Sequence, residues 1–345
     1  MKTVICKADG SLEVVEVGIP KIGRGQALTR TIANGICGTD VHLMLKAFKG
    51  ITTDMYPIML GHENVGEVVE VGSGVTTFKV GDKVLLPFLD ADKMNVGPYE
   101  SAWGGLSEYC VVHDPAFDHH DVYKNDLAKA QCIIPDFIDP VDAVMLVTFG
   151  EVLSAVKYFG IQKDCPVVIF GAGPVGMTFI KMCKMIGASP VISVVRNDIK
   201  KKKAEDAEAD IIFNSSEIDV DAKIREMYPA GVRYVIDAVG SPQIVNEAMG
   251  LICDRGEICC YGVPRQEEIH LDFSKADYNW VLNFQQMPRK EEEAIAHTEI
   301  IEWIRQGKLE PKKFISDYYN FDNVIQAYQD AFDKKSYRKG VVIYK

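Results

Sequence analysis

Two patterns of apolar residues follow one another along the chain of 345 residues. Up to about residue 150, short apolar runs alternate with polar residues and end at glycine or proline, as in LEVVEV at 12–17 and GEVVEVG at 66–72. Such alternation is typical of β-strands that are buried on one face. The first part of the chain is therefore predicted to be a strand-rich domain.

From about residue 151 the pattern changes to continuous apolar runs that are separated by helical segments. The runs PVVIFG, PVISVV, ADIIF, YVIDAVG and EICCYG alternate with segments such as PVGMTFIKMCKMIG. This alternation indicates βαβ units on a parallel sheet. After residue 290, two helical stretches (EEEAIAHTEIIEWIRQG and DNVIQAYQDAFDK) precede a final strand, KGVVIYK. The predicted fold class is α/β, with a β-rich domain and a parallel-sheet domain.

Composition restricts the possible partners. The chain has 49 acidic and 38 basic side chains, a net charge of -11, which disfavours nucleic acid and anionic membrane surfaces. No apolar run reaches the ~18 residues of a membrane-spanning helix, and the N-terminal segment MKTVICKADGSLEVVEV lacks the apolar stretch of a signal peptide. We expect a cytoplasmic protein with a small-molecule substrate, in which the nine scattered cysteines are mostly free thiols.

A glycine-rich loop opens the second part of the chain. In VVIFGAGPVGMTFI, three glycines separate a predicted strand from a predicted helix. This context fits a dinucleotide pyrophosphate at a helix N-terminus, and an ordinary strand-to-helix turn is the alternative. The residues expected to bind the cofactor here are Gly171, Gly173, Pro174, Val175 and Gly176.

The end of the next strand bears on the choice of nicotinamide cofactor. An acidic residue there would bind the ribose 2′-hydroxyl of NAD, whereas an arginine suits the 2′-phosphate of NADP. The sequence PVISVVRNDIK places Val195 and Arg196 at this point, and the first acidic residue, Asp198, follows later. We predict NADP(H) over NAD(H), with Arg196 on the phosphate and Lys200 as a helper. The alternative is a solvent-facing arginine in a site that accepts both cofactors.

A cysteine in NGICGTDVHL raises the question of a metal. Glycines on either side of Cys37 predict a turn over residues 34–43. His62 and Glu63 in MLGHENVGEVVEVG, and Glu151 in TFGEVLSAV, add an imidazole and two carboxylates. All these groups are competent zinc ligands. Taken singly, each has an ordinary alternative: a core thiol, a satisfied polar histidine, or a carboxylate at a helix N-terminus.

The order of the motifs ICGTDVH, GHENVGEVVEVG, GDKV and GAGPVG resembles that of the zinc-dependent medium-chain alcohol dehydrogenases. The resemblance covers essentially the whole chain. The glutamate at 151 is similar to that of the sorbitol (polyol) dehydrogenase and threonine dehydrogenase branch. The resemblance implies a GroES-like catalytic domain over 1–152 and 291–345 and a doubly wound Rossmann domain over 153–290. It also implies a homodimer or homotetramer.

The resemblance assigns roles to the candidate metal ligands. Cys37, His62 and Glu151 match the catalytic zinc ligands of the family. Glu63 matches a nearby carboxylate that binds zinc or exchanges with it through water. It is therefore predicted to be a catalytic residue as well as a metal-site residue. Asp40 matches the acid that orients the ligand histidine, as metal-bound histidines generally require.

A proton path and further cofactor contacts also follow from the resemblance. The proton released from an alcohol must reach water, and Thr39 and His42 match the relay that carries it. The alternative for His42 is a histidine on a helix surface. Weaker matches come from the loops DAVGS and YGVP, from NFQQ and from the C-terminal segment, each with ordinary loop structure as its alternative. The residues that these weaker matches predict to contact the cofactor are Val239, Gly262, Val263, Asn283 and Arg338.

The chain departs from many relatives between GDKV and GGLSEY. Those relatives hold a structural zinc with four cysteines, whereas the interval LLPFLDADKMNVGPYESAWGGLSEY contains no cysteine before Cys110. We expect one catalytic zinc per chain and no structural zinc. Phe88, Tyr99 and Trp103 are the expected apolar anchors of the shorter loop.

The resemblance implies a zinc-dependent oxidoreductase that transfers a hydride between a nicotinamide cofactor and a secondary alcohol or ketone. The substrate class is a polyol, sugar or cyclitol. One alternative is a threonine 3-dehydrogenase-like amino-alcohol dehydrogenase. Another is a zinc-free reductase or a non-catalytic binding protein of the same fold, against which the joint presence of Cys37, His62 and Glu151 argues. The sequence does not identify the particular alcohol.

Overall fold

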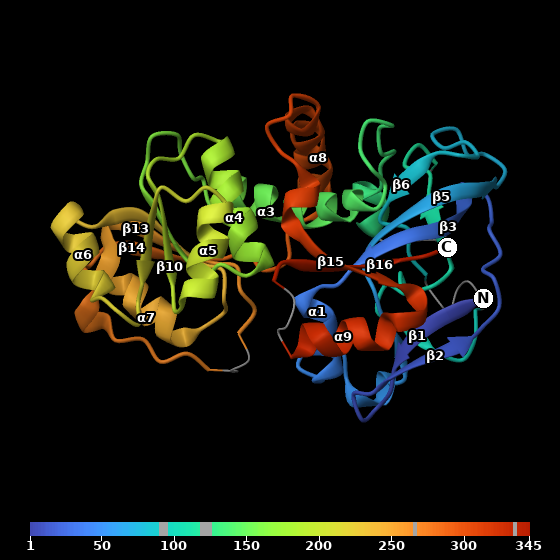
Figure 1. The fold of residues 1–345 in the computed structure, drawn as a ribbon, viewed down its shortest axis with the longest axis horizontal. Coiled ribbons are helices and arrows are strands. Elements are labelled where there is room, and N and C mark those ends of the chain that lie inside the picture. The colour runs from blue at the N-terminus through green and yellow to red at the C-terminus, as the bar shows by residue number, and fades with distance from the viewer. Residues whose placement is uncertain (90–95, 118–125, 265–267, 334–336) are drawn as a thin grey trace. The chain divides into compact units, whose positions relative to one another are not determined.

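The computed structural model describes residues 1–89, 96–117, 126–264, 268–333 and 337–345, which form two compact units (Figure 1). The first unit comprises Met1–Thr148 and Arg289–Lys345, and the second comprises Phe149–Pro288. Helix α3 (Met145–Tyr158) begins in the first unit and ends in the second. Within the described ranges, no helix is both long and apolar enough to cross a membrane.

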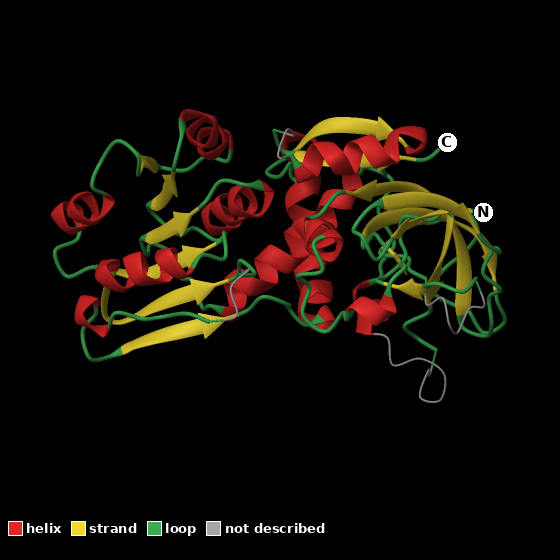
Figure 2. Cartoon of the chain, turned by 90° about the horizontal axis from the view of Figure 1, so that it is seen from below, coloured by secondary structure: helices red, strands yellow, loops and turns green. Residues whose placement is uncertain are grey.

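The first unit is built mainly of strands (Figure 2). One sheet has the order β2-β1-β4-β7; the other has the order β15-β16-β3-β5-β6, with β8 paired to β3. The strands are β1 (Lys2–Cys6), β2 (Leu12–Glu16), β3 (Gln26–Gly35), β4 (Ile58–Met59), β5 (Glu63–Val71), β6 (Lys83–Leu85), β7 (Glu100–Ser101), β8 (Tyr109–His113), β15 (Ile315–Asn320) and β16 (Lys339–Ile343). The last strand of the chain thus completes a sheet that the N-terminal segment began.

Helices of the first unit connect or cover these strands. They are α1 (Gly38–Met44), α8 (Lys290–Arg305) and α9 (Val324–Phe332), with short 3-10 turns η1 (Thr53–Met55), η2 (Asp126–Ala130), η3 (Asp142–Val144), η5 (Pro311–Phe314) and η6 (Phe321–Asn323). Residues of α1, α9, β1, β4 and β16 share one buried apolar cluster. This cluster fixes α1, which carries several candidate site residues.

The segment 34–43, expected to be a turn, is divided between a strand and a helix. Asn34 and Gly35 end β3, and α1 begins at Gly38. Cys37 is the extended residue before the helix, and its backbone N–H donates to the Asp40 carboxylate at 3.4 Å. The prediction of a turn was wrong because an acidic side chain at the third helical position satisfies an otherwise free N–H and starts a helix.

The second unit is a parallel sheet with the strand order β11-β10-β9-β12-β13-β14. This is the doubly wound order of dinucleotide-binding folds, so the predicted fold class is confirmed. The strands are β9 (Val167–Phe170), β10 (Val191–Val195), β11 (Ile211–Asn214), β12 (Val232–Asp237), β13 (Ile252–Cys260) and β14 (Trp280–Phe284). The helices are α4 (Pro174–Met185), α5 (Asp198–Asp206), α6 (Val220–Met227) and α7 (Pro242–Leu251), with the turn η4 (Phe273–Lys275).

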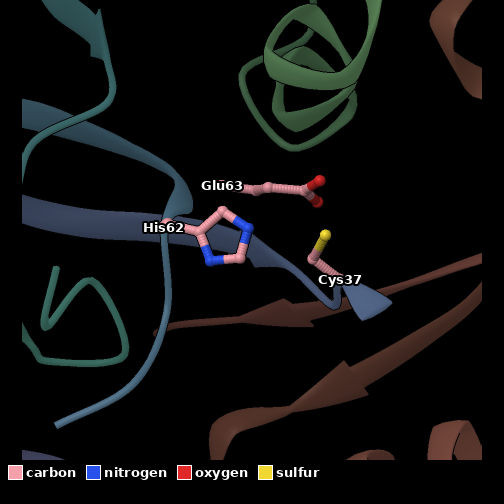
Figure 3. Close-up of side chains that lie close together, drawn as sticks. All are labelled: Cys37, His62 and Glu63. Carbon is pink, nitrogen blue, oxygen red and sulfur yellow. The ribbon is translucent and has the colours of Figure 1, made fainter. Parts of the chain in front are cut away.

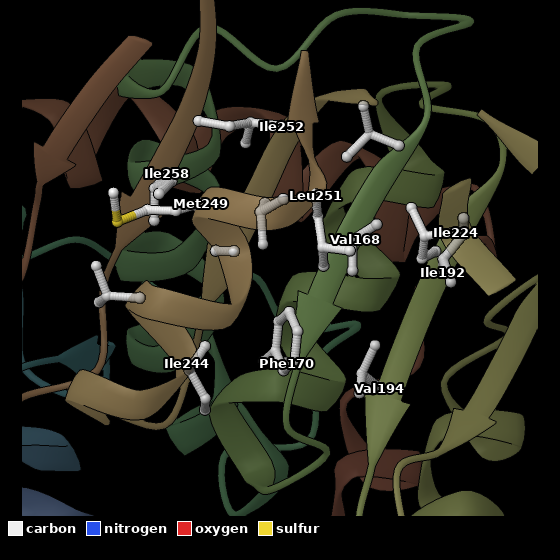
Figure 4. Packing of buried hydrophobic residues seen from close by; sticks show 14 of the residues in the cluster. Val168, Phe170, Ile192, Val194, Ile224, Ile244, Met249, Leu251, Ile252 and Ile258 are labelled. Atoms are coloured by element: carbon white, nitrogen blue, oxygen red, sulfur yellow. The ribbon is translucent and has the colours of Figure 1, made fainter. Parts of the chain in front are cut away.

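One face of this sheet carries a buried apolar core (Figure 4). Val168 and Phe170 of β9 and Ile192 and Val194 of β10 alternate along their strands, so they point to the same face. There they pack with Ile224 of α6 and with apolar residues of α7. Each such buried side chain contributes roughly 1.5–3 kcal/mol. The core holds the carboxyl ends of the strands in register, where the cofactor loops begin.

Candidate active site

Three side chains of the first unit form a candidate metal centre (Figure 3). Cys37, His62 and Glu63 each offer one ligand atom, and the three atoms lie within 4.8 Å of one another. A thiolate, an imidazole and a carboxylate are the donors that zinc prefers in proteins. Donor atoms on one zinc ion lie roughly 3–4 Å apart, which is close to this spacing.

The pairing of β3 with β5 positions this group. Gly35 lies opposite Glu63 in the antiparallel register, so Cys37, just after β3, and His62, just before β5, meet at one end of the sheet. A β-carbon at Gly35 would collide with the Glu63 carboxylate. At Gly61, with φ +95°, a β-carbon would collide with the neighbouring backbone. Glycine at position 35 therefore leaves room for the Glu63 carboxylate, and glycine at position 61 lets the chain before His62 pass close to the backbone of Leu106.

Both oxygens of Glu63 are engaged within the same unit. Lys339 of β16 donates from Nζ to Oε1 at 2.6 Å and also pairs with Oε2. The Thr148 hydroxyl donates to Oε1 at 3.0 Å. Glu63 is 1% exposed and Lys339 is 3% exposed, so this is a buried ion pair. A metal ion at Cys37 and His62 would compete with Lys339 for this carboxylate.

Asp40 of α1 faces the candidate ligand His62. Asp40 Oδ1 lies 3.4 Å from His62 Nδ1, which is an ion-pair distance, and within the described residues neither atom makes a hydrogen bond. Asp40 Oδ2 accepts a hydrogen bond from the Tyr328 hydroxyl at 3.0 Å. Burial lowers the pKa of His62, but the negative charges of Asp40 and Cys37 outweigh it and raise that pKa well above its ordinary value. Because Nδ1 faces Asp40, the other ring nitrogen is left for a metal.

Trp103 covers the His62 ring. The two ring centroids are 4.9 Å apart, and the Phe48 ring meets Trp103 edge-on at 5.8 Å. Trp103 also packs with Phe88 and Tyr99 in an apolar cluster. The sequence suggested Trp103 only as a loop anchor, and its proximity to His62 could not be read from spacing.

Three other predicted residues lie on helices. Thr39 and His42 are half-buried and three residues apart, so they share one face of α1. Glu151 lies in the middle of α3 and belongs to the second unit, whereas the candidate metal centre is formed within the first. The alternative of a carboxylate at a helix N-terminus is therefore wrong for Glu151, and its role as a ligand stays a prediction.

The glycine loop of the second unit has the geometry that a pyrophosphate requires. Gly171 follows β9 with φ +103°, and α4 begins at Pro174 with Gly173 as its N-cap. A β-carbon at Gly176 would collide with the Gly171 carbonyl. The loop, with Val175 in the first turn of α4, leaves the free N–H groups of a helix N-terminus at the carboxyl end of β9.

The end of β10 offers no carboxylate. Val195 is buried as the last residue of the strand, and Arg196 is exposed. Asn197 caps α5 by accepting the Lys200 backbone N–H at 3.0 Å. This cap fixes Lys200 in the first turn of α5, close in sequence to Arg196.

Asp237 organises the loop after β12, although no sequence motif marks it as a site residue. Its Oδ1 accepts the backbone N–H groups of Val239 at 2.8 Å and Gly240 at 2.9 Å, and its Oδ2 accepts that of Ser241 at 3.0 Å. Burial raises the pKa of Asp237, and these hydrogen bonds act in the opposite direction. Gly262, after β13, approaches this loop so closely that a β-carbon would collide with Gly240.

The remaining predicted cofactor residues differ in their surroundings. Val239 and Val263 are 52% and 37% exposed at the ends of β12 and β13. Asn283 lies in β14 rather than in a loop, and its amide donates to Glu257 Oε1 at 2.7 Å. Arg338 belongs to the first unit, where its guanidinium lies 5.3 Å from the centroid of the Tyr337 ring.

Comparison with known proteins identifies the family. The alcohol dehydrogenase GroES-like domain family matches residues 23–120, and the zinc-binding dehydrogenase family matches residues 174–285. L-threonine 3-dehydrogenase of Pyrococcus furiosus is 31% identical over 278 residues, which are 76% of this chain and 75% of that protein. Sorbitol dehydrogenase of Bacillus subtilis is 24% identical over 358 residues, which are 100% of this chain and 97% of that protein. The chain belongs to the zinc-dependent medium-chain alcohol dehydrogenase family, which confirms the predicted resemblance.

Solved structures share the fold over nearly the whole chain. 2R,3R-butanediol dehydrogenase from Bacillus subtilis has a TM-score of 0.82 at 22% identity and 99% coverage of both chains. A short chain alcohol dehydrogenase (rspB) from E. coli CFT073, complexed with NADH, has a TM-score of 0.80 at 23% identity and 99% coverage of both chains. A protein from Sinorhizobium meliloti 1021, assigned as a zinc-binding dehydrogenase and bound to NADP, has a TM-score of 0.78 at 25% identity, with 99% and 98% coverage.

Proposed function

We propose that this chain transfers a hydride between a nicotinamide cofactor and the secondary hydroxyl of a polyol, sugar or cyclitol, or the corresponding ketone. The observation that carries this proposal is the group Cys37, His62 and Glu63 in a chain that also has the dinucleotide loop of α4. The names of the relatives, which include sorbitol, butanediol and threonine 3-dehydrogenases, support an alcohol as the substrate.

The candidate ligands fit a single zinc ion. Cys37 and His62 would hold it, with Glu63 beside it. Glu151 stays the further ligand that the family resemblance predicts. A bound zinc ion supplies a Lewis acid that polarises the reacting oxygen of the substrate. The proposal also keeps the expectation of one catalytic zinc and no structural zinc per chain.

The residues of the chain orient the reactants and move the proton. Asp40 faces Nδ1 of His62 and so directs the other ring nitrogen towards the metal. Trp103 packs against the His62 ring from one side. The Thr39 hydroxyl would accept the substrate proton while it gives up its own, and the partly exposed His42 would pass the released proton to solvent.

We infer that NADP(H) is the preferred cofactor. The support is the apolar Val195 at the end of β10 and the exposed Arg196 that follows it. Related structures hold either NADH or NADP, so they favour neither cofactor. Replacing Arg196 with alanine should lower kcat/KM for NADP about 10-fold to 100-fold and leave that for NAD unchanged, since charge-assisted hydrogen bonds to the phosphate are lost. A wild-type preference for NAD would contradict this inference.

A second candidate function is oxidation of an amino alcohol such as threonine. The observation that favours it is the 31% identity to L-threonine 3-dehydrogenase. The test is a panel of polyols, inositols, sugars and threonine with both cofactors, followed by absorbance of the reduced nicotinamide. Activity should disappear with a chelator and return with zinc. Full activity of the metal-free chain would favour a zinc-free reductase instead. Assembly as a homodimer or homotetramer also remains a prediction.

A further inference from the structure

Tyr328 lies behind the candidate metal centre, on a helix from the opposite end of the chain. It belongs to α9, is completely buried, and donates its hydroxyl proton to Asp40 Oδ2 at 3.0 Å. The other oxygen of Asp40 faces His62 Nδ1 at 3.4 Å. A phenol, a carboxylate and an imidazole thus form a series that begins in α9 and ends at a candidate metal ligand.

The hydroxyl of Tyr328 makes the shortest of the contacts that fix the Asp40 carboxylate. Asp40 Oδ2 also accepts the Cys37 backbone N–H, at the longer distance of 3.4 Å. The Asp40 carboxylate therefore faces the side chain of one candidate ligand, His62, and the backbone of another, Cys37. Because Asp40 is completely buried, it depends on protein donors for its orientation.

The packing around Tyr328 is apolar and does not require its hydroxyl. Leu43, Tyr56, Val324 and Val342 share its buried apolar cluster, in which a phenylalanine ring would provide the same packing. Burial and then the charge of Asp40 raise the pKa of Tyr328 well above its ordinary value, so the phenol retains its proton and donates. The hydroxyl thus serves the carboxylate rather than the packing.

We propose that Tyr328 is a positioning residue of the metal centre, whose hydroxyl orients Asp40 so that Asp40 orients His62. This role rests on the proposed zinc function. Partners of a metal-bound histidine that lie outside the ligands themselves typically change metal affinity 10-fold to 100-fold when removed. Tyr328 is one step further from the metal, so the lower end of that range applies.

The test is Tyr328→Phe in the full chain, with zinc affinity measured by competition against a chelator. Zinc should bind about tenfold more weakly than in the wild type. The visible absorption of the cobalt-substituted variant should also shift, because the ligand geometry changes. Tyr56→Phe is the matched control, since Tyr56 shares the cluster but donates to the Leu43 carbonyl at 2.6 Å. It should leave zinc affinity and the cobalt spectrum unchanged.

A double-mutant cycle with Asp40→Asn separates positioning from packing. If Tyr328 acts through Asp40, adding Tyr328→Phe to Asp40→Asn should weaken zinc binding no further. Equal losses for Tyr328→Phe and Tyr56→Phe, or a full additional loss in the double variant, would overturn the proposal. If the wild type binds zinc and Tyr328→Phe binds it with the same affinity, the role of Tyr328 is overturned but the proposed function is not. A wild type that binds no zinc overturns the proposed function, and this role with it.

Discussion

The buried pair of Glu63 and Lys339 provides a quantitative test of the candidate metal centre. Lys339→Met removes the ammonium group but keeps an unbranched side chain. Glu63, which is 1% exposed, then retains the hydrogen bond from Thr148 without the compensating charge. Removing one partner of a buried pair typically costs about 3–5 kcal/mol, because the remaining charge stays desolvated. We expect the free energy of unfolding to fall by this amount.

The assay is urea unfolding of the metal-free chain. The double variant Glu63→Gln with Lys339→Met removes both charges, so it should recover most of the loss. Lys313→Met is the control, because Lys313 pairs with Glu310 at the surface at 2.7 Å and its loss should cost less than about 1 kcal/mol. A loss below about 1 kcal/mol for Lys339→Met, or no recovery in the double variant, would refute the reasoning.

The same variant reports on competition for the Glu63 carboxylate. Without Lys339, both oxygens of Glu63 are released from the ion pair and become available to a metal. Zinc affinity, measured by chelator competition, should therefore rise in Lys339→Met. A fall in zinc affinity would show that Lys339 supports the metal centre instead of competing with it.

Two further predictions concern a buried histidine and the cofactor loop. Burial, with the nearby charge of Lys290, lowers the pKa of His297 from 6.5 to about 4. Its contribution to stability is thus complete above pH 6.5 and is lost as the pH falls towards 4. The free energy of unfolding should fall by about 3 kcal/mol over this pH range. In His297→Gln, urea unfolding should no longer show this fall, and a pH profile equal to that of the wild type would contradict the role of His297. Asp237→Ala leaves three backbone N–H groups of the β12 loop without their carboxylate, so cofactor binding measured by fluorescence titration should weaken about tenfold at unchanged zinc content, and wild-type affinity would count against this role.

The strands and helices with strong local patterns could be predicted from the sequence. β9, β10 and α4 follow the runs PVVIFG, PVISVV and PVGMTFIKMCKMIG, because buried parallel strands and the helices between them have distinct compositions. β14 was not predicted, and the alternative of ordinary loop structure for Asn283 was wrong, because Asn283 lies in this strand. Its five residues are at most half-buried, so they lack the continuous apolar run of an interior strand. The prediction of a turn over residues 34–43 was wrong because it was based on the glycines. It did not include the contact of Asp40 with the Cys37 N–H, which starts a helix.

The candidate site could be predicted only where its residues carry local chemistry. Cys37, His62 and Glu63 belong to recognisable motifs and are metal donors by residue type. Lys339 and Tyr328 contact them or Asp40 across 276 and 288 residues of sequence, so their roles depend on tertiary packing. The available signal for Lys339 was a lysine beside the apolar run of KGVVIYK, whereas Tyr328 has the pattern of an ordinary buried aromatic residue.

The central claim is that Cys37 belongs to a single zinc centre in a nicotinamide-dependent dehydrogenase. Elemental analysis of the purified wild type and of Cys37→Ser, together with cofactor titration, tests it most directly. We predict one zinc per wild-type chain, and a variant that loses zinc and turnover but still binds the cofactor. Two zinc ions per wild-type chain, or a Cys37→Ser variant that retains its zinc and its activity, would contradict the claim.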